Sequence, residues 1–349
     1  MADYKTRLQR DLDGWIAAGL VPAENRKPIL DTVPDAPRVE ASTALAVVGA
    51  LLLGIAAIAF VAANWSEIPR IGRFALILGL FLGVAGGAAW AGRSGARPVL
   101  TNTLLTVAAL IYAAAIGLTG QIFDIAGDPQ RALRGAGLAA GLLALAGRSS
   151  GAGIAALALV GLGDFAGDDR SRWLVFAAPA GLALAWFWRS RPLAHAASLA
   201  LIVGALAAIS EWGLDRDGRD FLIGAGVLAA LAGLARHAAA RPEAKIAFLW
   251  FVWGALLHFG LGGLGDHGQA FTAAHRAAWL ALSAGTVALG VHERQGVVTT
   301  AGVVSMAAAV CAILFDLGFG LMAAAGLFAA CAVAALAVAL VVRGRRARR

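Results

Sequence analysis

The sequence predicts an all-α, polytopic integral membrane protein, a bundle of about 12 transmembrane helices with a short cytoplasmic N-terminal amphipathic helix. Of its 349 residues, 60% are hydrophobic and only 14% are charged, and the mean hydropathy is +0.77. Soluble domains usually have about 45–50% apolar and about 25% charged residues. The apolar residues also form runs of roughly 15 to 25 between short charged breaks, the length that a bilayer imposes. These observations exclude a water-soluble enzyme.

The first 41 residues predict a cytoplasmic amphipathic helical segment and a linker. Leu8, Leu12, Trp15 and Ile16 recur at helical spacing, and Gly19 follows as a stop signal. Such a helix would bind a partner or the lipid surface, or it would cap the inner mouth of its own bundle. The segment lacks the apolar core and cleavage site of a signal peptide, so we expect the first hydrophobic helix to remain as an anchor.

Residues 42–342 predict the transmembrane bundle. The fourth, fifth and eighth spans are the weakest, since each has only about 15 apolar residues and must be short, tilted or shielded by its neighbours. The expected spans are Ser42–Ala63, Phe74–Ala91, Val99–Thr119, Ala132–Ala146, Gly151–Gly163, Trp173–Trp188, Leu193–Ile209, Phe221–Ala235, Ile246–Leu264, Ala273–Gly290, Val297–Phe315 and Phe319–Val342.

The charges predict the orientation of the bundle. The chain has 29 Lys and Arg against 21 Asp and Glu, a net charge of +8. With the N-terminus inside, 20 of the 29 basic residues lie on the cytoplasmic side, including the basic tail at 343–349. This is the positive-inside pattern. We therefore expect both termini in the cytoplasm and the lipid bilayer as the main partner, and we expect no nucleic acid partner.

The third expected span is the most polar. Thr106, Tyr112, Thr119 and Gln121 lie along it, and Asp124 follows it. At about 100° per residue, Tyr112 and Thr119 share one face of the helix. Polar faces of membrane helices contact protein or water rather than lipid. They predict either hydrogen bonds between helices or a polar path for a solute.

Ionisable residues within the expected spans are few. His258 lies inside one span, and Asp316 interrupts two apolar runs. A charged group costs about 2.5–3.5 kcal/mol at a helix centre. The simplest interpretation makes His258 a satisfied core histidine and puts Asp316 in a tight outer turn. The alternative is a proton or cation site in which Asp316 pairs with an outer arginine, one of Arg131, Arg134 and Arg172.

The other acidic residues and histidines of the outer loops predict solvated surfaces. Asp164 begins an acidic run that is interleaved with arginine and offers too few ligands for Ca²⁺. Asp266, His267 and His275 match no closed zinc pattern. We therefore expect no metal and no cofactor.

Glycines at helical spacing predict close helix packing. Gly79, Gly83 and Gly87 recur every four residues in the second span, and Gly137 with Gly141 repeats the pattern in the fourth. Small residues allow helix backbones to approach closely in lipid.

No motif predicts catalysis. The stretch Gly147–Gly151 matches G-x-S-x-G, but it falls in a helix-to-helix turn rather than after a strand. Cys311 and Cys331 lie in apolar runs without a companion cysteine or histidine, which is typical of core residues. We assign no catalytic residue.

Three motifs in the N-terminal part carry a resemblance. Leu12–Leu20 closes the first helix with Trp-Ile-x-x-Gly-Leu, Ala62–Pro69 contains Ala-Asn-Trp-x-x-Ile-Pro, and Leu118–Phe123 contains Gly-Gln-Ile-Phe. With these motifs, about the first 150 residues resemble an uncharacterised bacterial family of predicted multi-pass membrane proteins, domain of unknown function 2157. The resemblance implies an inner-membrane protein and supplies no catalytic residues.

The same resemblance marks Asn64, Trp65 and Gln121, all expected near the outer surface. Trp65 has the properties of an interfacial anchor, and Asn64 could cap the following turn. Alternatively, Asn64, Gln121 and Asp124 converge into an outer vestibule.

Length, span number and the lack of catalytic motifs lead us to expect a secondary transporter or permease-like protein for a small solute or ion. One alternative is a non-transporting scaffold or assembly partner that contacts a membrane protein or a second copy through its glycine-rich faces. A third is a membrane-embedded enzyme that acts on a lipid-linked substrate through Glu67, Asp124 or Asp316. The two halves show no clear repeat of paired, broken helices.

Overall fold

The computed structural model describes residues 4–32, 65, 67–93, 95, 97–167, 171–212, 218–264, 267–318 and 326. Within these ranges the chain forms helices and turns and has no strand. It divides into two units, Met1–Pro69 and Arg70–Arg349, and each is treated by itself. The expected spans 42–63 and 319–342 and the basic tail lie outside the described residues.

The N-terminal unit contains a small helical hairpin. Helix α1 (Tyr4–Ala17) is followed by η1 (Ala23–Asn25) and α2 (Arg26–Asp31), with Leu12 and Leu30 buried. Arg26 Nε donates to Asp13 Oδ1 at 2.7 Å. The hydrogen bond from this guanidinium lowers the pKa of the Asp13 carboxyl below its ordinary value.

The motif Trp-Ile-x-x-Gly-Leu has a structural explanation in this unit. Leu20 N donates to Trp15 O at 2.9 Å across Gly19, whose φ is +71°. This is a Schellman-type helix end, in which glycine takes the left-handed position and hydrophobic residues flank it. The motif therefore specifies where α1 stops.

The second unit consists of helices that coincide with the ten expected spans between residues 70 and 318. Their bounds are α4 (Arg70–Gly92), α5 (Pro98–Ile122), α6 (Pro129–Gly147), α7 (Ser150–Phe165), α8 (Leu174–Trp188), α9 (Arg191–Trp212), α10 (Arg219–His237), α11 (Pro242–Leu261), α12 (Gln269–His292) and α13 (Gly296–Asp316).

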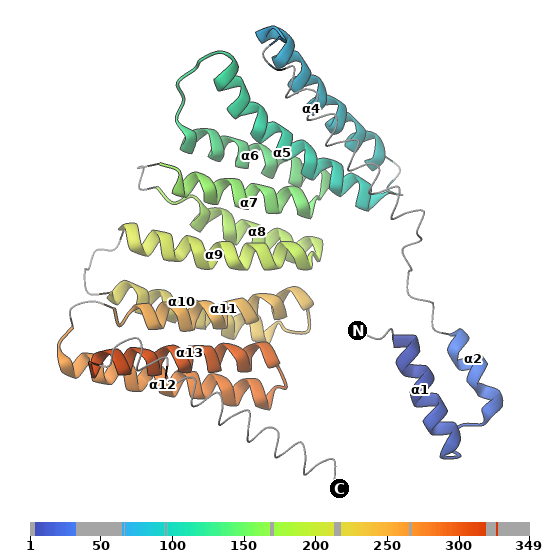
Figure 1. Cartoon of the computed structure of the whole chain (residues 1–349), viewed down its shortest axis with the longest axis vertical. Coiled ribbons are helices and arrows are strands. Elements are labelled where there is room, and N and C mark those ends of the chain that lie inside the picture. Colours follow the sequence, from blue (N-terminus) through green and yellow to red (C-terminus); the bar gives the residue numbers. More distant parts are fainter. Residues whose placement is uncertain are drawn as a thin grey trace. The chain divides into compact units, whose positions relative to one another are not determined.

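These helices form successive antiparallel hairpins, α4–α5, α6–α7, α8–α9, α10–α11 and α12–α13, stacked one after another (Figure 1). The second helix of each hairpin packs against the second helix of the next, so α5, α7, α9, α11 and α13 form a continuous layer. Among the described residues, the first helices of successive hairpins do not pack extensively on one another. The unit is thus a translational repeat, and the starts of α6, α8 and α10 at residues 129, 174 and 219 are separated by 45 residues.

Arginine closes the tight turn inside three hairpins. Arg148, Arg189 and Arg294 have φ values of 47°, 53° and 54°, the left-handed region. After each, the next backbone N–H donates to a carbonyl five residues back: Ser149 to Ala144, Ser190 to Ala185 and Gln295 to Gly290. Glycine adopts this left-handed conformation at a lower conformational free energy than arginine does. An arginine instead places a cation at a helix C-terminus, where the helix dipole favours it.

The core is divided among neighbouring hairpins and is rich in alanine. One cluster joins α4 to α7, a second joins α7 to α9, and a third joins α9, α10, α11 and α13. Gly137 lies at a close approach, because a Cβ there would lie 2.7 Å from the Val160 side chain. A Cβ at Gly79 or Gly83 would meet no described atom within 4 Å, and at Gly87 and Gly141 it would make ordinary contacts. The packing role of Gly79 and Gly83 therefore stays a prediction.

Six described helices are long and apolar enough to cross a membrane: α4, α5, α9, α10, α11 and α13. Helices α7 and α8 are apolar but shorter. Helices α6 and α12 have 19 and 24 residues but are not among these six. An all-helical, multi-pass membrane protein follows, while the number of 12 spans stays a prediction.

Candidate functional site

Arginine–carboxylate pairs join the two helices of four hairpins at the end opposite the arginine turns. We call this the acidic end of the stack and the opposite end the basic end. In each pair the arginine lies just before the first helix or within its first eight residues, and the carboxylate lies at or just after the C-terminus of the second. The pairs are Arg70–Asp124, Arg134–Asp164, Arg172–Glu211 and Arg276–Asp316, at 2.8, 2.8, 3.0 and 2.8 Å.

The Arg134–Asp164 pair is the most deeply buried of the four, with side-chain exposures of 6% and 1%. Arg134 Nε and Nη2 both donate to Asp164 Oδ1, and Leu174 N donates to Oδ2 at 2.7 Å. Arg134 also donates to the hydroxyl and carbonyl of Ser171 and lies over the Trp173 ring. The prediction of a solvated loop face at Asp164 was therefore wrong, because the residue ends α7 inside the protein.

Asp316 also has a partner other than those expected. Arg276 Nε donates to Asp316 Oδ2 at 2.8 Å, so the alternative in which Asp316 pairs with Arg131, Arg134 or Arg172 was wrong, while Asp316 does lie at the end of a helix. Those three arginines lie in other hairpins, whereas Arg276 belongs to the helix that packs directly on α13. Each of these ion pairs therefore forms between the two helices of one hairpin.

The largest polar-lined cavity described lies between α4, α5 and α6 at the acidic end, and we call it the α4–α6 pocket. Its volume is about 900 Å³, within the roughly 300–1,000 Å³ range of small-molecule sites. Apolar side chains of α4 and α5 form its walls. Its polar lining residues are Tyr112, Thr119, Gln121, Asp124 and Asp128. Four of these five were expected to line a polar path or vestibule.

Local structure explains how these side chains reach the pocket. Tyr112 and Thr119 are seven residues apart on α5 and therefore share a face. Asp124 follows the end of α5 with φ of +53°, and Ile125 N donates to Gly120 O at 2.9 Å. The left-handed residue turns the chain back over the pocket, a position that glycine usually takes.

The pocket extends from the acidic end towards a pair of rings. Phe81 and Tyr112 are the deepest lining residues of α4 and α5, and their ring centroids are 5.5 Å apart. At the mouth, the Arg70–Asp124 pair is exposed, with side-chain exposures of 62% and 72%. The polar groups therefore gather at the mouth, except for Tyr112 at the base.

Sequence reasoning missed the α4 wall and Asp128. Phe74 and Phe81 line the pocket seven residues apart on α4, a spacing that places them on one face. Asp128 caps α6, since its Oδ1 accepts a hydrogen bond from Gln130 N at 2.9 Å. An aspartate followed by proline at the first helical position is a helix-start signal that would have located it.

Thr106 does not line the pocket. Its hydroxyl donates to Asn102 O at 2.7 Å, and it packs closely on Gly151 of α7. Asn102 Oδ1 in turn accepts hydrogen bonds from Ser149 Oγ at 2.9 Å and Gly151 N at 3.1 Å. The G-x-S-x-G stretch is therefore a capped helix-to-helix turn, and this part of α5 is a packing surface.

The other predicted site residues lie apart from the pocket. His258 is fully buried in α11; its Nδ1 bonds to Gly254 O at 2.8 Å, and Nε2 has no hydrogen-bond partner among the described residues. His275 is buried in α12, stacked on Phe259. Across the described ranges no three His, Cys, Asp or Glu side chains group as metal ligands. Asn64 lies outside the described residues, and Trp65 belongs to the N-terminal unit.

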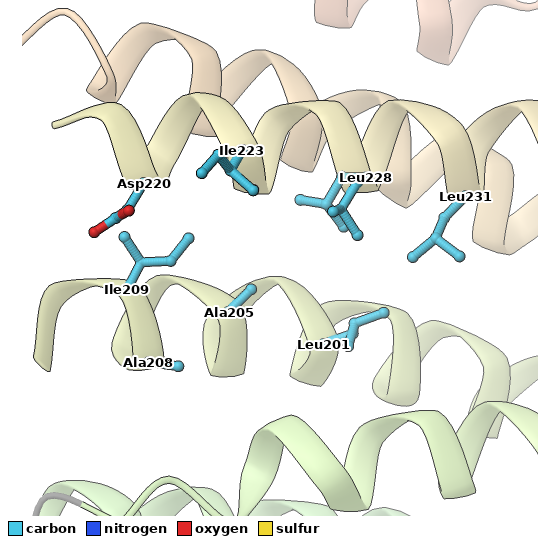
Figure 2. A pocket seen from close by; sticks show the side chains of 10 residues that line it. Leu201, Ala205, Ala208, Ile209, Asp220, Ile223, Leu228 and Leu231 are labelled. Atoms are coloured by element: carbon cyan, nitrogen blue, oxygen red, sulfur yellow. The ribbon is translucent and has the colours of Figure 1, made fainter. Parts of the chain in front are cut away.

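A second cavity, of about 340 Å³, lies along α9 and α10 (Figure 2). The labelled side chains come from these two neighbouring helices, and Asp220 at one end of the row is the single carboxylate among them. A third, of about 450 Å³, lies between α10, α11 and α12 with Arg236 in its lining. The second cavity has one polar side chain in its lining and the third has two, Arg236 and Thr286, whereas the larger α4–α6 pocket has five and is the candidate site.

Comparison with known proteins agrees with the resemblance in the N-terminal part. Residues 13–153 match the family model described as "Predicted membrane protein (DUF2157)", a stretch that runs from α1 into α7 and includes the whole α4–α6 pocket. Neither the curated proteins nor the solved structures gave a match. The resemblance of the N-terminal part to this family of predicted membrane proteins is confirmed over residues 13–153.

Proposed function

We propose that this membrane protein is a transporter or permease-like protein that binds a small solute in the α4–α6 pocket. The observation that carries the proposal is the pocket itself. Its polar lining includes four side chains from residues 112–124, those of Tyr112, Thr119, Gln121 and Asp124, and apolar side chains form its walls. Ligand sites in proteins have this composition, a mainly apolar lining with a few placed polar groups.

The shape of the pocket supports access from one end. Its polar groups lie at the acidic end, and the contact between Phe81 and Tyr112 lies at its base. Deeper along α5, Thr106 is held against Asn102 and α7. In the proposal, the acidic end faces outward, in agreement with the arginine turns at the opposite end. Passage of a solute requires α4 to separate from α5 at Phe81.

Water accessibility along α5 tests the proposal. Single cysteines replace Thr106, Leu110, Tyr112 and Thr119, one at a time. The background carries Cys311→Ala and Cys331→Ala. An impermeant maleimide is then added from each side. Leu110 is the matched control, because it is 52% exposed on α5 and does not line the pocket.

The proposal expects labelling at Thr119→Cys and Tyr112→Cys from the outside and none at Leu110→Cys, which the proposal places towards lipid. Labelling at Thr106→Cys from the opposite side during solute flux would add the second half of an alternating path. Equal labelling at Tyr112→Cys and Leu110→Cys, or none at Thr119→Cys, would overturn the proposal.

One observation favours a second function, a membrane scaffold. The hairpins repeat by translation along the stack, unlike the inverted repeats of many secondary transporters. Stacked repeats typically present extended binding surfaces. A scaffold needs no water at Tyr112, so the same labelling experiment separates the two functions.

A further inference from the structure

From the charges of the α4–α6 pocket we infer the class of its ligand, a cationic amphiphile with one alkyl chain. This inference rests on the proposed function, since it names what that pocket binds. Three features carry it: the sign of the lining charges, their position at the mouth, and the length of the apolar part.

The charged groups that line the described pocket are both acidic. Asp124 and Asp128 belong to the lining, whereas their partners Arg70 and Arg131 do not. Both ion pairs are exposed to solvent, and an exposed ion pair contributes only about 0–1 kcal/mol to stability. The carboxylates therefore keep acceptor sites for a cation in the pocket, because each has about four lone-pair positions.

The backbone adds to the negative potential at the mouth. Helix α5 ends at Ile122, beside Gln121 and Asp124 in the lining. The C-terminus of a helix carries about half a negative charge. The N-terminus of α6, which carries the opposite partial charge, is already capped by Asp128. A cationic head group thus meets the Asp124 carboxylate, the C-terminus of α5 and the Gln121 amide, and the Asp128 carboxylate lies in the same lining.

The apolar part of the pocket fits an alkyl chain. The lining runs along α5 from Gln121 to Tyr112, which at 1.5 Å per residue is about 14 Å. This equals about half of the roughly 30 Å hydrocarbon core. The walls are Phe74, Ile77 and Phe81 on one side and Ile116 on the other, so the chain lies between helices with its head at the membrane surface.

Protection of a pocket cysteine measures this preference in the full chain in liposomes. The probes are dodecylammonium, dodecanol and dodecyl sulfate, which share a tail and differ in head charge. The readout is the rate of maleimide labelling at Thr119→Cys, with Leu317→Cys as a surface reference, because Leu317 is exposed at the acidic end and lies outside the pocket. The reference corrects for changes in the bilayer.

We expect dodecylammonium to protect Thr119→Cys at a concentration about tenfold lower than dodecanol, and dodecyl sulfate to protect least. Combining Asp124→Asn with Asp128→Asn should remove the tenfold preference. Asparagine tolerates the left-handed conformation at 124 and caps a helix well at 128, so both changes preserve the backbone. Asp220→Asn, in the α9–α10 cavity, is the matched control and should leave the preference unchanged.

Equal protection by the three probes would overturn the cationic class while leaving an amphiphile pocket. Labelling of Thr119→Cys that no probe slows would overturn the amphiphile and leave a water-filled pocket for another solute. If Thr119→Cys does not label at all, the proposed function fails before the ligand class is reached.

Discussion

Neutralising the carboxylate of an arginine–carboxylate pair at the acidic end should lower the stability of the protein, and the loss should increase with the burial of the pair. The change with the largest expected effect is Asp164→Asn. Asp164 accepts two hydrogen bonds from the Arg134 guanidinium and one from the backbone of α8. The amide replaces the carboxylate at nearly the same volume, so the substitution removes charge and leaves the packing in place.

The expected magnitude follows from burial. Arg134 and Asp164 have side-chain exposures of 6% and 1%, and breaking such a pair by removing one partner costs about 3–5 kcal/mol. Arg70 and Asp124 occupy the equivalent place in the first hairpin but are 62% and 72% exposed. Neutralising an exposed pair costs about 0–1 kcal/mol. The two substitutions should therefore differ by about 3 kcal/mol.

Unfolding of the purified protein in mixed micelles of native and denaturing detergent provides the measurement. The fluorescence of the ten tryptophans follows unfolding, and one of them, Trp173, has its ring centroid 5.4 Å from the Arg134 guanidinium carbon. Replacing both partners with apolar residues, Arg134→Met with Asp164→Leu, should restore most of the loss, because no buried charge then remains unpaired. Similar losses for Asp164→Asn and Asp124→Asn, or no recovery in the double variant, would refute the reasoning.

Three further predictions concern backbone geometry and pH. Gly290→Ala should lower the free energy of unfolding by about 1–3 kcal/mol, because its Cβ would clash with the backbone nitrogen of Thr299 in α13, whereas Gly285→Ala on the same helix meets nothing within 4 Å and should stabilise. Arg189→Gly should raise the free energy of unfolding by about 0.5–1 kcal/mol by relieving the left-handed conformation, and Arg189→Ala should not. The contact of Asp13 with Arg26 should be complete at neutral pH and lost as the pH falls through the lowered pKa of Asp13, below 3.8.

Detergent unfolding of the matched pairs checks the first two of these predictions, and ¹³C chemical shifts of the Asp13 carboxyl check the third. Equal effects of alanine at 290 and 285 would contradict the close approach of α12 and α13 at Gly290. A gain from alanine at 189 as large as that from glycine would mean that backbone strain is not the cause. Titration of Asp13 at an unchanged pKa would contradict its contact with α2.

The sequence predicts the helices of this protein better than their pairing. Periodicity and hydropathy locate the ten helices between residues 70 and 318, because each is an apolar run bounded by charged residues or turn residues. They also predict that Tyr112 and Thr119 share a face, since both lie on one helix. Periodicity and hydropathy do not predict which charged residues form ion pairs. Asp164 and Arg134 are 30 residues apart, and the acidic run that follows Asp164 gives it the composition of a solvated loop.

The repeat was also missed for a physical reason. The pattern sought in the sequence was a pair of broken helices at matching positions in the two halves of the chain. Successive hairpins related by translation do not produce that pattern. The signal in the sequence is local: arginine at 148, 189 and 294 follows the last residues of a helix and lies one residue before a serine or glutamine, from which the next helix starts. Each turn is short enough to require a left-handed residue, and this requirement identifies the turns as equivalent.

Stacking in hairpins has a consequence for how such a chain is made and how it evolves. Two antiparallel segments return the chain to the side from which it started, so a hairpin can be gained or lost without inverting anything that follows. Each described hairpin packs mainly on the hairpins next to it along the chain, so a new pair of helices can join the stack as soon as it is made. A ribosome can therefore deliver the array in pairs, and its length can change in steps of two helices but not of one.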